Sequence, residues 1–195
     1  INNPTRKFEH EDEFEEFDYS VWGGRKYRIL SVGNLKKVKN HDLLLKAFSL
    51  LPRGDARLVI LGGGSEECRL RRVAESLGIA NEVVFAGFCN NPKYFYSSAN
   101  LFVISSDNEG FGNVIVEALS FGLPVVSTDC PSGPAEILEN GRYGWLTPVG
   151  DAEALAWAIE EALRTPVDKE ALKRRAAEFS PEKAAKKYLE AMELA

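Results

Sequence analysis

The chain has few of the residues that build metal or redox centres, and it has no long apolar run. Its 195 residues include two histidines and three cysteines, and the cysteines form no C-x-x-C pair. This disfavours a structural zinc site, and the odd number of cysteines fits a reducing cytosol. No apolar run of about 18 residues and no basic, apolar leader occurs, so we expect neither a membrane span nor a signal peptide in these residues. A long Lys/Arg stripe with interleaved aromatics is also missing, which argues against nucleic acid as a partner.

The acidity of the chain is confined to one segment near its start. The net charge of −5 includes a block of seven acids, namely Glu9, Glu11, Asp12, Glu13, Glu15, Glu16 and Asp18. Without this block, 22 acids face 24 Lys and Arg, so the remainder is mildly basic at net +2. Such blocks are usually solvated. Because the chain opens on Ile1 and not on Met, we expect a fragment whose residues 1–25 are an acidic linker from a preceding domain.

Apolar, β-branched runs alternate with amphipathic stretches along the rest of the chain. Short runs bounded by glycine or proline predict strands at 27–32, 57–61, 83–86, 101–105, 124–127 and 144–146. Helical periodicity and caps predict helices at 41–51, 66–77, 91–99, 114–119, 133–138, 151–163, 168–179 and 180–193. This alternation predicts an α/β fold, a Rossmann-like, doubly wound parallel sheet of about six strands with helices on both faces.

The segment from Glu109 to Glu117 carries two carboxylates around a turn from strand to helix. Gly110 and Gly112 let backbone N–H groups approach an anion, and the start of a helix favours a negatively charged ligand. Open α/β sheets bind ligands at the carboxyl ends of their strands, where this turn is expected. The two acids could hold hydroxyls of a sugar and of a ribose. Alternatively, they are surface carboxylates stabilised by the helix dipole, or the paired acids of a glycoside hydrolase.

Three other loops reach the same edge of the predicted sheet. The loop after the first strand lacks the G-x-G-x-x-G and G-K-[ST] patterns but carries three lysines. Lys39, beside a helix start, suits a phosphate, whereas Lys36 and Lys37 suit solvent. The glycines 62–64 predict a tight turn at least as well as a ligand contact. The backbone near Phe88 could read a nucleobase or form a plain loop.

These segments together resemble the C-terminal, donor-binding domain of a retaining GT-B glycosyltransferase of family 4, within the group 1 glycosyl transferases. Glu109–Glu117 is similar to that family's two-glutamate motif, and Val32–Lys39 is similar to its phosphate loop. The other matching stretches are Leu61–Gly64, Val84–Gly87 and Pro124–Glu136. The resemblance implies a donor-binding domain at 26–165, which is one half of a GT-B enzyme, followed by C-terminal helices at 166–195.

The resemblance implies a hexosyltransferase (EC 2.4) that moves a sugar from a nucleoside diphosphate sugar to a saccharide or lipid-linked acceptor, with retention of anomeric configuration. The resemblance implies that Glu109 is catalytic, that Glu117 binds the ribose hydroxyls, and that Lys39 neutralises the leaving diphosphate. The other implied donor-binding positions are Gly33, Asn34, Gly63, Phe88, Gly110, Phe111, Gly112, Asn113 and Val114. The family often has Arg where Asn34 stands, so lysines of this loop would carry more of the charge. No metal or other cofactor is implied.

The same resemblance places the acceptor mainly on an N-terminal domain outside these residues. It implies a cytoplasmic enzyme of polysaccharide biosynthesis, and it leaves open a peripheral attachment of the full-length protein to the inner face of the membrane. We expect the 195 residues alone to bind donor weakly and not to transfer sugar. Two other hypotheses stay open, a non-catalytic nucleotide-sugar-binding module and a sugar-nucleotide epimerase on the same fold.

Overall fold

Six parallel strands form one sheet in the part of the chain that the structure describes. The computed structural model describes residues 18–180 and residue 183. The strands are β1 (Tyr27–Val32), β2 (Ala56–Leu61), β3 (Val83–Gly87), β4 (Leu101–Ile104), β5 (Val125–Thr128) and β6 (Trp145–Thr147). Their order across the sheet is β3-β2-β1-β4-β5-β6, and all neighbours are parallel. This is the doubly wound order, so the predicted Rossmann-like sheet is confirmed.

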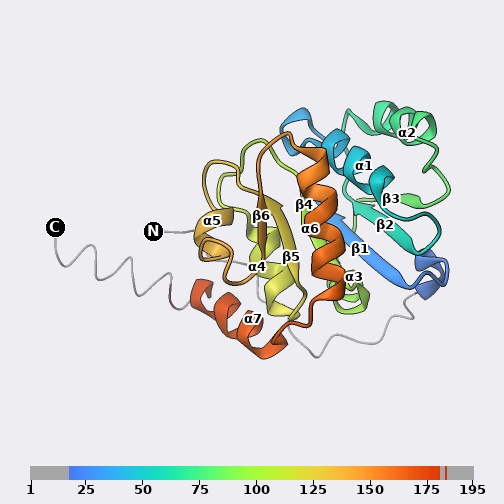
Figure 1. The fold of residues 1–195 in the computed structure, drawn as a ribbon. Helices are drawn as coiled ribbons and strands as arrows, with labels where there is room; N and C mark the ends of the chain where they lie inside the picture. The colour runs from blue at the N-terminus through green and yellow to red at the C-terminus, as the bar shows by residue number, and fades with distance from the viewer. Residues whose placement is uncertain (1–17, 181–182, 184–195) are drawn as a thin grey trace.

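Helices cover both faces of the sheet. They are α1 (His41–Leu50), α2 (Glu67–Ser76), α3 (Lys93–Ser98), α4 (Asn113–Ser120), α5 (Pro134–Ile137), α6 (Ala152–Arg164) and α7 (Lys169–Ala176). Buried side chains of α1, α2 and α6 join one core cluster, and those of α3, α4, α5 and α7 join the other. In Figure 1 α1 and α6 lie in front of the sheet. The two clusters confirm the expectation of helices on both faces.

The sequence period of the strands explains the two cores. In β2, Leu58 and Ile60 belong to the cluster under α1 and α6, whereas Val59 and Leu61 belong to the cluster under α4. Successive side chains of a strand point to opposite faces, so a strand that is apolar at every position is buried on both sides. The continuous apolar runs of the sequence are therefore what a covered parallel sheet requires.

The folded body begins before β1. A 3-10 turn, η1 (Tyr19–Trp22), lies within the segment expected to be an acidic linker, and Trp22 is 2% exposed. The indole Nε1 of Trp22 donates a hydrogen bond to Ser98 Oγ (3.0 Å), and its ring meets Phe95 edge-on. Trp22 thus closes the core beside α3. Residues 1–17, with most of the acidic block, lie outside the described residues.

The last elements follow the predicted caps. Asp151 and Asp168 accept hydrogen bonds from Ala154 N (2.9 Å) and Ala171 N (3.0 Å), which fixes the starts of α6 and α7. The single helix expected at 168–179 is instead α7 followed by a 3-10 turn, η3 (Ala177–Phe179). The helix predicted at 180–193 falls outside the described residues, apart from its first residue and Lys183.

Candidate functional site

The loops after β1, β2, β3 and β4 meet at one edge of the sheet. The chain runs outward from β1 through β2 to β3, and then returns to the other side of β1 to form β4. Between β1 and β4 the loops therefore diverge to opposite sides and leave a crevice at the carboxyl ends of the strands. The candidate residues predicted from the sequence lie on these loops and on the helices that follow them.

The β1–α1 loop is tied to the loop after β4. It contains a 3-10 turn, η2 (Lys37–Lys39), and Ser105 Oγ donates hydrogen bonds to the carbonyls of Lys39 (3.1 Å) and Asn40 (3.0 Å). The amide of Asn40 also donates to Asp107 Oδ1 (2.7 Å) and its side-chain oxygen caps α1 at Leu43 N. These bonds place the Lys39 side chain beside the β4–α4 loop.

Lys39 and Glu109 form the central ion pair of the crevice. Lys39 Nζ lies 2.6 Å from Glu109 Oε1 and 2.7 Å from Glu109 Oε2. Glu109 is 7% exposed, whereas the Lys39 side chain keeps 24% of its surface in solvent. A buried carboxylate needs such a partner, because leaving it alone would cost several kcal/mol. The ion pair thus fixes the position of both side chains.

Two buried hydroxyl groups support the position of Glu109. Ser106 Oγ donates to Glu109 Oε1 (2.6 Å), and Thr128 Oγ1 of β5 donates to the Ser106 carbonyl (2.7 Å). Ser106 and Thr128 are both 0% exposed. The carboxylate is thus oriented by a serine of its own loop, and Thr128 of β5 holds that loop in place. Sequence reasoning did not select Ser106 or Thr128, since a serine or threonine at a strand end carries no distinctive signal.

A hollow of about 270 Å³ opens beside this ion pair. Five of the donor-binding residues expected from the resemblance line it: Gly33, Asn34, Lys39, Phe88 and Val114. The remaining lining residues are Val32, Leu61, Gly62, Cys89 and Pro92. Among these described residues Lys39 has the only charged side chain, and the Phe88 ring is 79% exposed. Lys36 and Lys37 are exposed and do not line it.

The second carboxylate, Glu117, has a partner of its own. It lies in the second turn of α4 and accepts a hydrogen bond at Oε2 from the phenol of Tyr96 on α3 (2.9 Å). The two glutamates of the motif are therefore held by different groups, Glu109 by Lys39 and Glu117 by Tyr96. Tyr96 was not anticipated, because in the sequence it is one of three consecutive aromatic residues, 94–96, and nothing there distinguishes it from the other two.

The glycines after β2, residues 62–64, let the β2–α2 loop pack closely against the β1–α1 loop. Gly62 has a φ of 134°, and a Cβ there would lie 2.1 Å from the Gly33 carbonyl oxygen. A Cβ on Gly64 would lie 2.3 Å from the Leu35 carbonyl oxygen. Gly63, the member of the run expected at the donor, has open space around it and is not among the residues that line the hollow. Gly62, its neighbour, lines the hollow instead.

The turn into α4 contributes no lining to the hollow, because Gly110, Phe111, Gly112 and Asn113 are all absent from its walls. Gly112 caps the helix with a φ of 91°, and Asn113 is the exposed first residue of α4. The Phe111 ring packs against Phe179, with centroids 5.6 Å apart, and belongs to the core beneath the turn. Any donor contact by Phe111 would therefore come from its main chain. A Cβ added to Gly110 would meet no described atom within 4 Å beyond its chain neighbours, so the main chain there is open to approach.

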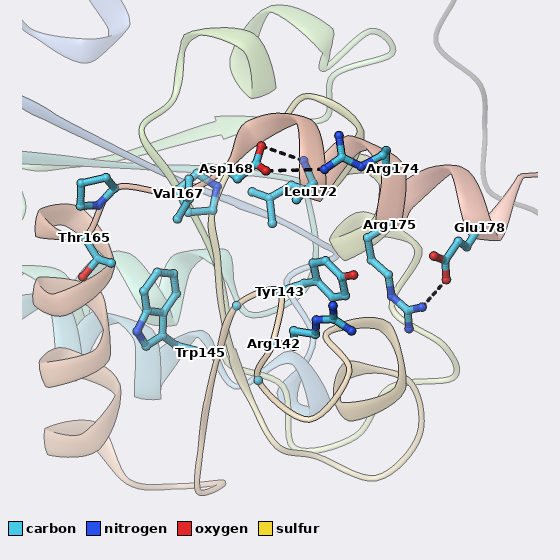
Figure 2. Close-up of a pocket in the computed structure, with 15 residues that line it drawn as sticks. Arg142, Tyr143, Trp145, Thr165, Val167, Asp168, Leu172, Arg174, Arg175 and Glu178 are labelled. Carbon is cyan, nitrogen blue, oxygen red and sulfur yellow. Dashed lines mark hydrogen bonds and ion pairs between the residues drawn. The ribbon is translucent and has the colours of Figure 1, made fainter.

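A larger cleft, of about 750 Å³, lies at the opposite edge of the sheet, before β5 and β6 (Figure 2). Its arginines are already engaged. Arg175 donates to the carbonyls of Ile137 (2.9 Å) and Glu136 (2.6 Å) and pairs with Glu178, and Arg174 pairs with Asp168 at 3.5 Å. Because ligands of this fold bind at the carboxyl ends of the strands, we place the site in the smaller hollow.

His41, the first residue of α1, is buried next to the ion pair. It is 4% exposed, and its Nδ1 has no hydrogen-bond partner. Burial lowers the pKa of His41 to about 4, and the charge of Lys39 acts in the same direction, against a smaller opposing effect of Asp42. The ring is therefore neutral near pH 7.

We expect this histidine to make the fold sensitive to mild acid. The pKa of 6.5 in the unfolded chain exceeds the folded value, so protons bind the unfolded state first and stability falls as pH decreases. Between about pH 7 and about pH 5 the free energy of unfolding should drop by about 2 kcal/mol through this group. Urea titrations at several pH values measure it. The His41→Gln variant should lose this slope, whereas His10→Gln, at the only other histidine, should keep it; equal slopes in all three proteins would refute the expectation.

Other classes of site find no support in the described residues. No group of three or more His, Cys, Asp or Glu side chains is clustered there in a way that could hold a metal ion. Among the described helices, none combines the length and the apolarity that a membrane crossing requires.

The fold and the crevice define an α/β domain of the doubly wound class with its ligand site at the switch point between β1 and β4. Residues 12–179 match the family described as glycosyl transferases group 1. The chain belongs to this family. Its Rossmann-like sheet is the one found in GT-B glycosyltransferases, as the resemblance implied.

Curated relatives support the assignment. The chain is 34% identical over 167 residues to the lipopolysaccharide core biosynthesis glycosyltransferase LpsE of Rhizobium meliloti, and the match covers 83% of the chain and 48% of the relative. It is 35% identical over 148 residues to the N-acetylgalactosamine-N,N'-diacetylbacillosaminyl-diphospho-undecaprenol 4-alpha-N-acetylgalactosaminyltransferase of Campylobacter jejuni, covering 76% of the chain and 40% of the relative. The chain thus spans less than half the length of both relatives.

Solved structures of glycosyltransferases share the fold. Anabaena Alr3699/HepE in complex with UDP superposes with a TM-score of 0.78 at 25% identity, over 88% of this chain and 50% of that one. The lipopolysaccharide outer core galactosyltransferase WaaB in its apo form gives a TM-score of 0.79 at 23% identity, over 87% and 49% of the two chains. Both likenesses extend over nearly the whole described domain.

Proposed function

We propose that this chain is the donor-binding half of a retaining glycosyltransferase that uses a nucleoside diphosphate sugar. The observation that carries the proposal is the Lys39–Glu109 ion pair, whose lysine lines a hollow in the switch-point crevice. A diphosphate needs a cation, and a sugar needs hydrogen-bond acceptors for its hydroxyls. The ammonium of Lys39 has three donors, so it can keep Glu109 and still reach a phosphate oxygen.

The nucleoside would occupy the hollow. Its apolar walls and the exposed Phe88 ring suit a base, and Glu117 would accept hydrogen bonds from the ribose hydroxyls. UDP is the nucleotide in the HepE complex, which favours uridine here as well. Asn34 is exposed at the rim and adds no charge, so Lys39 would carry the main electrostatic contact with the phosphates.

Catalysis would depend on electrostatic stabilisation and positioning. Glu109, fixed by Ser106 and Lys39, would hold the donor sugar near the reacting carbon, while Lys39 stabilises the charge that develops on the departing diphosphate. The main-chain N–H groups of 110–113, at the start of α4, would add partial positive charge on the same side. Lys39 and these N–H groups could stabilise the departing diphosphate without a metal ion, and we propose that no metal is needed.

The acceptor would be bound mainly by a further domain, since the chain spans less than half of its relatives. We propose a hexosyl transfer in polysaccharide or lipopolysaccharide assembly, to a saccharide or a lipid-linked acceptor, because the names of the two relatives describe such reactions. The enzyme would work in the cytoplasm, with the full-length protein attached peripherally to the membrane where the acceptor is a lipid. The 195 residues alone would bind donor weakly and transfer no sugar.

Calorimetric titration of the chain with UDP, GDP and ADP tests the proposal. We expect UDP to bind with a Kd of about 0.1–1 mM, which corresponds to about 4–5.5 kcal/mol, and the other two to bind more weakly. Inorganic phosphate serves as the control, because it lacks a base and a ribose for the hollow. If none of the three nucleotides binds at millimolar concentration, the site assignment is wrong.

A further inference from the structure

Glu117 lies one helical turn beyond the rim of the nucleotide hollow. Val114 lines the hollow, and Glu117 follows it by three positions, which places both on the same side of α4. Side chains on a helix lean toward its N-terminus, so the Glu117 carboxylate is directed back toward the turn that holds Val114. Glu117 does not itself line the hollow, but its side chain lies on the side of α4 that Val114 presents to it.

Tyr96 of α3 approaches the Glu117 carboxylate from the opposite side. Pro92, the N-cap of α3, lines the hollow, and Tyr96 follows it by one turn, with its N–H bonded to the Pro92 carbonyl (3.1 Å). The second turns of α3 and α4 thus face each other. The hydrogen bond from the Tyr96 phenol to Glu117 Oε2 (2.9 Å) joins them there.

The Tyr96 ring is held rigidly by its neighbours. It is 1% exposed, it stacks on Phe121 with an interplanar angle of 12° and centroids 5.5 Å apart, and it tilts against Phe102 at 5.8 Å. Burial raises the pKa of Tyr96 well above its usual value, and the charge of Glu117 adds to this, so the phenol remains a protonated donor. Its hydroxyl is therefore a fixed hydrogen-bond donor for the Glu117 carboxylate.

We propose that Tyr96 is a positioning residue that orients the Glu117 carboxylate toward the ribose of the nucleotide. The inference rests on the proposed function, in which Glu117 accepts hydrogen bonds from the ribose hydroxyls. The terminal torsion of a glutamate is broad when it is unrestrained. A charge-assisted bond to Oε2 narrows that torsion, so ribose recognition depends on a buried tyrosine that the ribose itself does not touch.

A ligand series separates this role from a merely structural one. The chain is titrated with UDP and with 2′,3′-dideoxy-UDP, which lacks the hydroxyls that Glu117 would bind. Tyr96→Phe keeps the stacked ring and removes only the phenol oxygen. It should lower the affinity for UDP by about 10-fold, as expected for the loss of one charge-assisted hydrogen bond. The affinity for the dideoxy nucleotide should change by less than about twofold, which is the scatter expected of a surface or distant change.

Three further variants sharpen the test. Glu117→Ala should abolish the preference for UDP over its dideoxy analogue, and adding Tyr96→Phe to it should cause no further loss, because the two residues act as a unit. Tyr27→Phe removes a phenol oxygen at the other end of β1 and should leave both affinities unchanged. Thermal unfolding of each variant checks that the fold is retained.

The outcomes are distinguishable. If Tyr96→Phe lowers the affinities for UDP and for its dideoxy analogue equally, or lowers neither, Tyr96 does not position Glu117. If the unaltered chain binds no UDP, the proposed function fails and this inference fails with it. If Glu117→Ala alters the preference for ribose hydroxyls while Tyr96→Phe behaves like the unaltered chain, the proposed function stands and only the role of Tyr96 is refuted.

Discussion

Replacing Lys39 with Met should weaken the binding of UDP by about 50-fold, the effect expected when a close charged contact to a phosphate is lost. Lys39 is the only charged side chain among the described residues that line the hollow. Its loss also leaves Glu109 without its cation, 2.6 Å away in the present structure, so that a buried negative charge would face the diphosphate. Attraction is replaced by repulsion, which is why the effect should be large. Nuclear magnetic resonance titration can measure affinities in the millimolar range that results.

Three controls separate the effect of charge from the effect of shape in this experiment. Lys36→Met removes a lysine from the same loop that is exposed and does not line the hollow, and it should change the affinity for UDP by less than about threefold, consistent with a screened surface charge. Adding Glu109→Gln to Lys39→Met should recover part of the binding, because the uncompensated carboxylate is removed. Binding of uridine, which has no phosphate, should be equal in all these proteins. A Lys39→Met variant that binds UDP as tightly as the unaltered chain would contradict the site.

Replacing Gly62 with Ala should destabilise the fold by about 3 kcal/mol or more, because backbone strain and a steric clash coincide there. The φ of 134° is one that residues with a Cβ rarely adopt, and the new Cβ would lie 2.1 Å from the Gly33 carbonyl oxygen. Relief requires the β2–α2 loop to move away from the β1–α1 loop. The midpoint of thermal unfolding should fall by about 10 °C for a domain of this size.

Gly63→Ala is the matched control for that substitution. It adds the same methyl group to the next residue, where the structure shows open space and no positive φ. Its cost should stay below about 1 kcal/mol, the range of ordinary surface changes. Urea denaturation of both variants measures the difference. Equal stabilities of the two would show that the loops do not pack as described.

Much of the fold could be predicted from the sequence, because its elements are short, strongly apolar and clearly bounded. Runs such as 57–61 and 101–105 have no polar alternation, which indicates burial on both faces, and their spacing leaves room for one crossover helix each. Asp151 before an amphipathic stretch predicted the start of α6 correctly. Trp22 was missed, because an aromatic beside an acidic block has no local signal that it fills a distant core.

The candidate site was predictable where it depends on backbone and charge. A lysine beside a helix start and two glutamates around a glycine turn are patterns that a sequence shows locally. The structure brings Lys39 into contact with Glu109. The roles of Ser106, Thr128 and Tyr96 were not predictable. Thr128 and Tyr96 act through contacts made between strands or between helices, and a single sequence does not record which distant side chains meet. Ser106 lies three residues from Glu109, but a serine in a loop carries no distinctive signal.

The mutual neutralisation of Lys39 and Glu109 has a consequence for selectivity among the anions of a cell. A free phosphate would share the Lys39 ammonium with Glu109 and offer no hydrogen-bond donor to the carboxylate in return, so such an ion gains little by entering. A ligand that supplies hydroxyl groups together with its phosphates satisfies both partners at once. Competition from abundant inorganic ions would then be suppressed by this internal linkage, without any need for a narrow entrance.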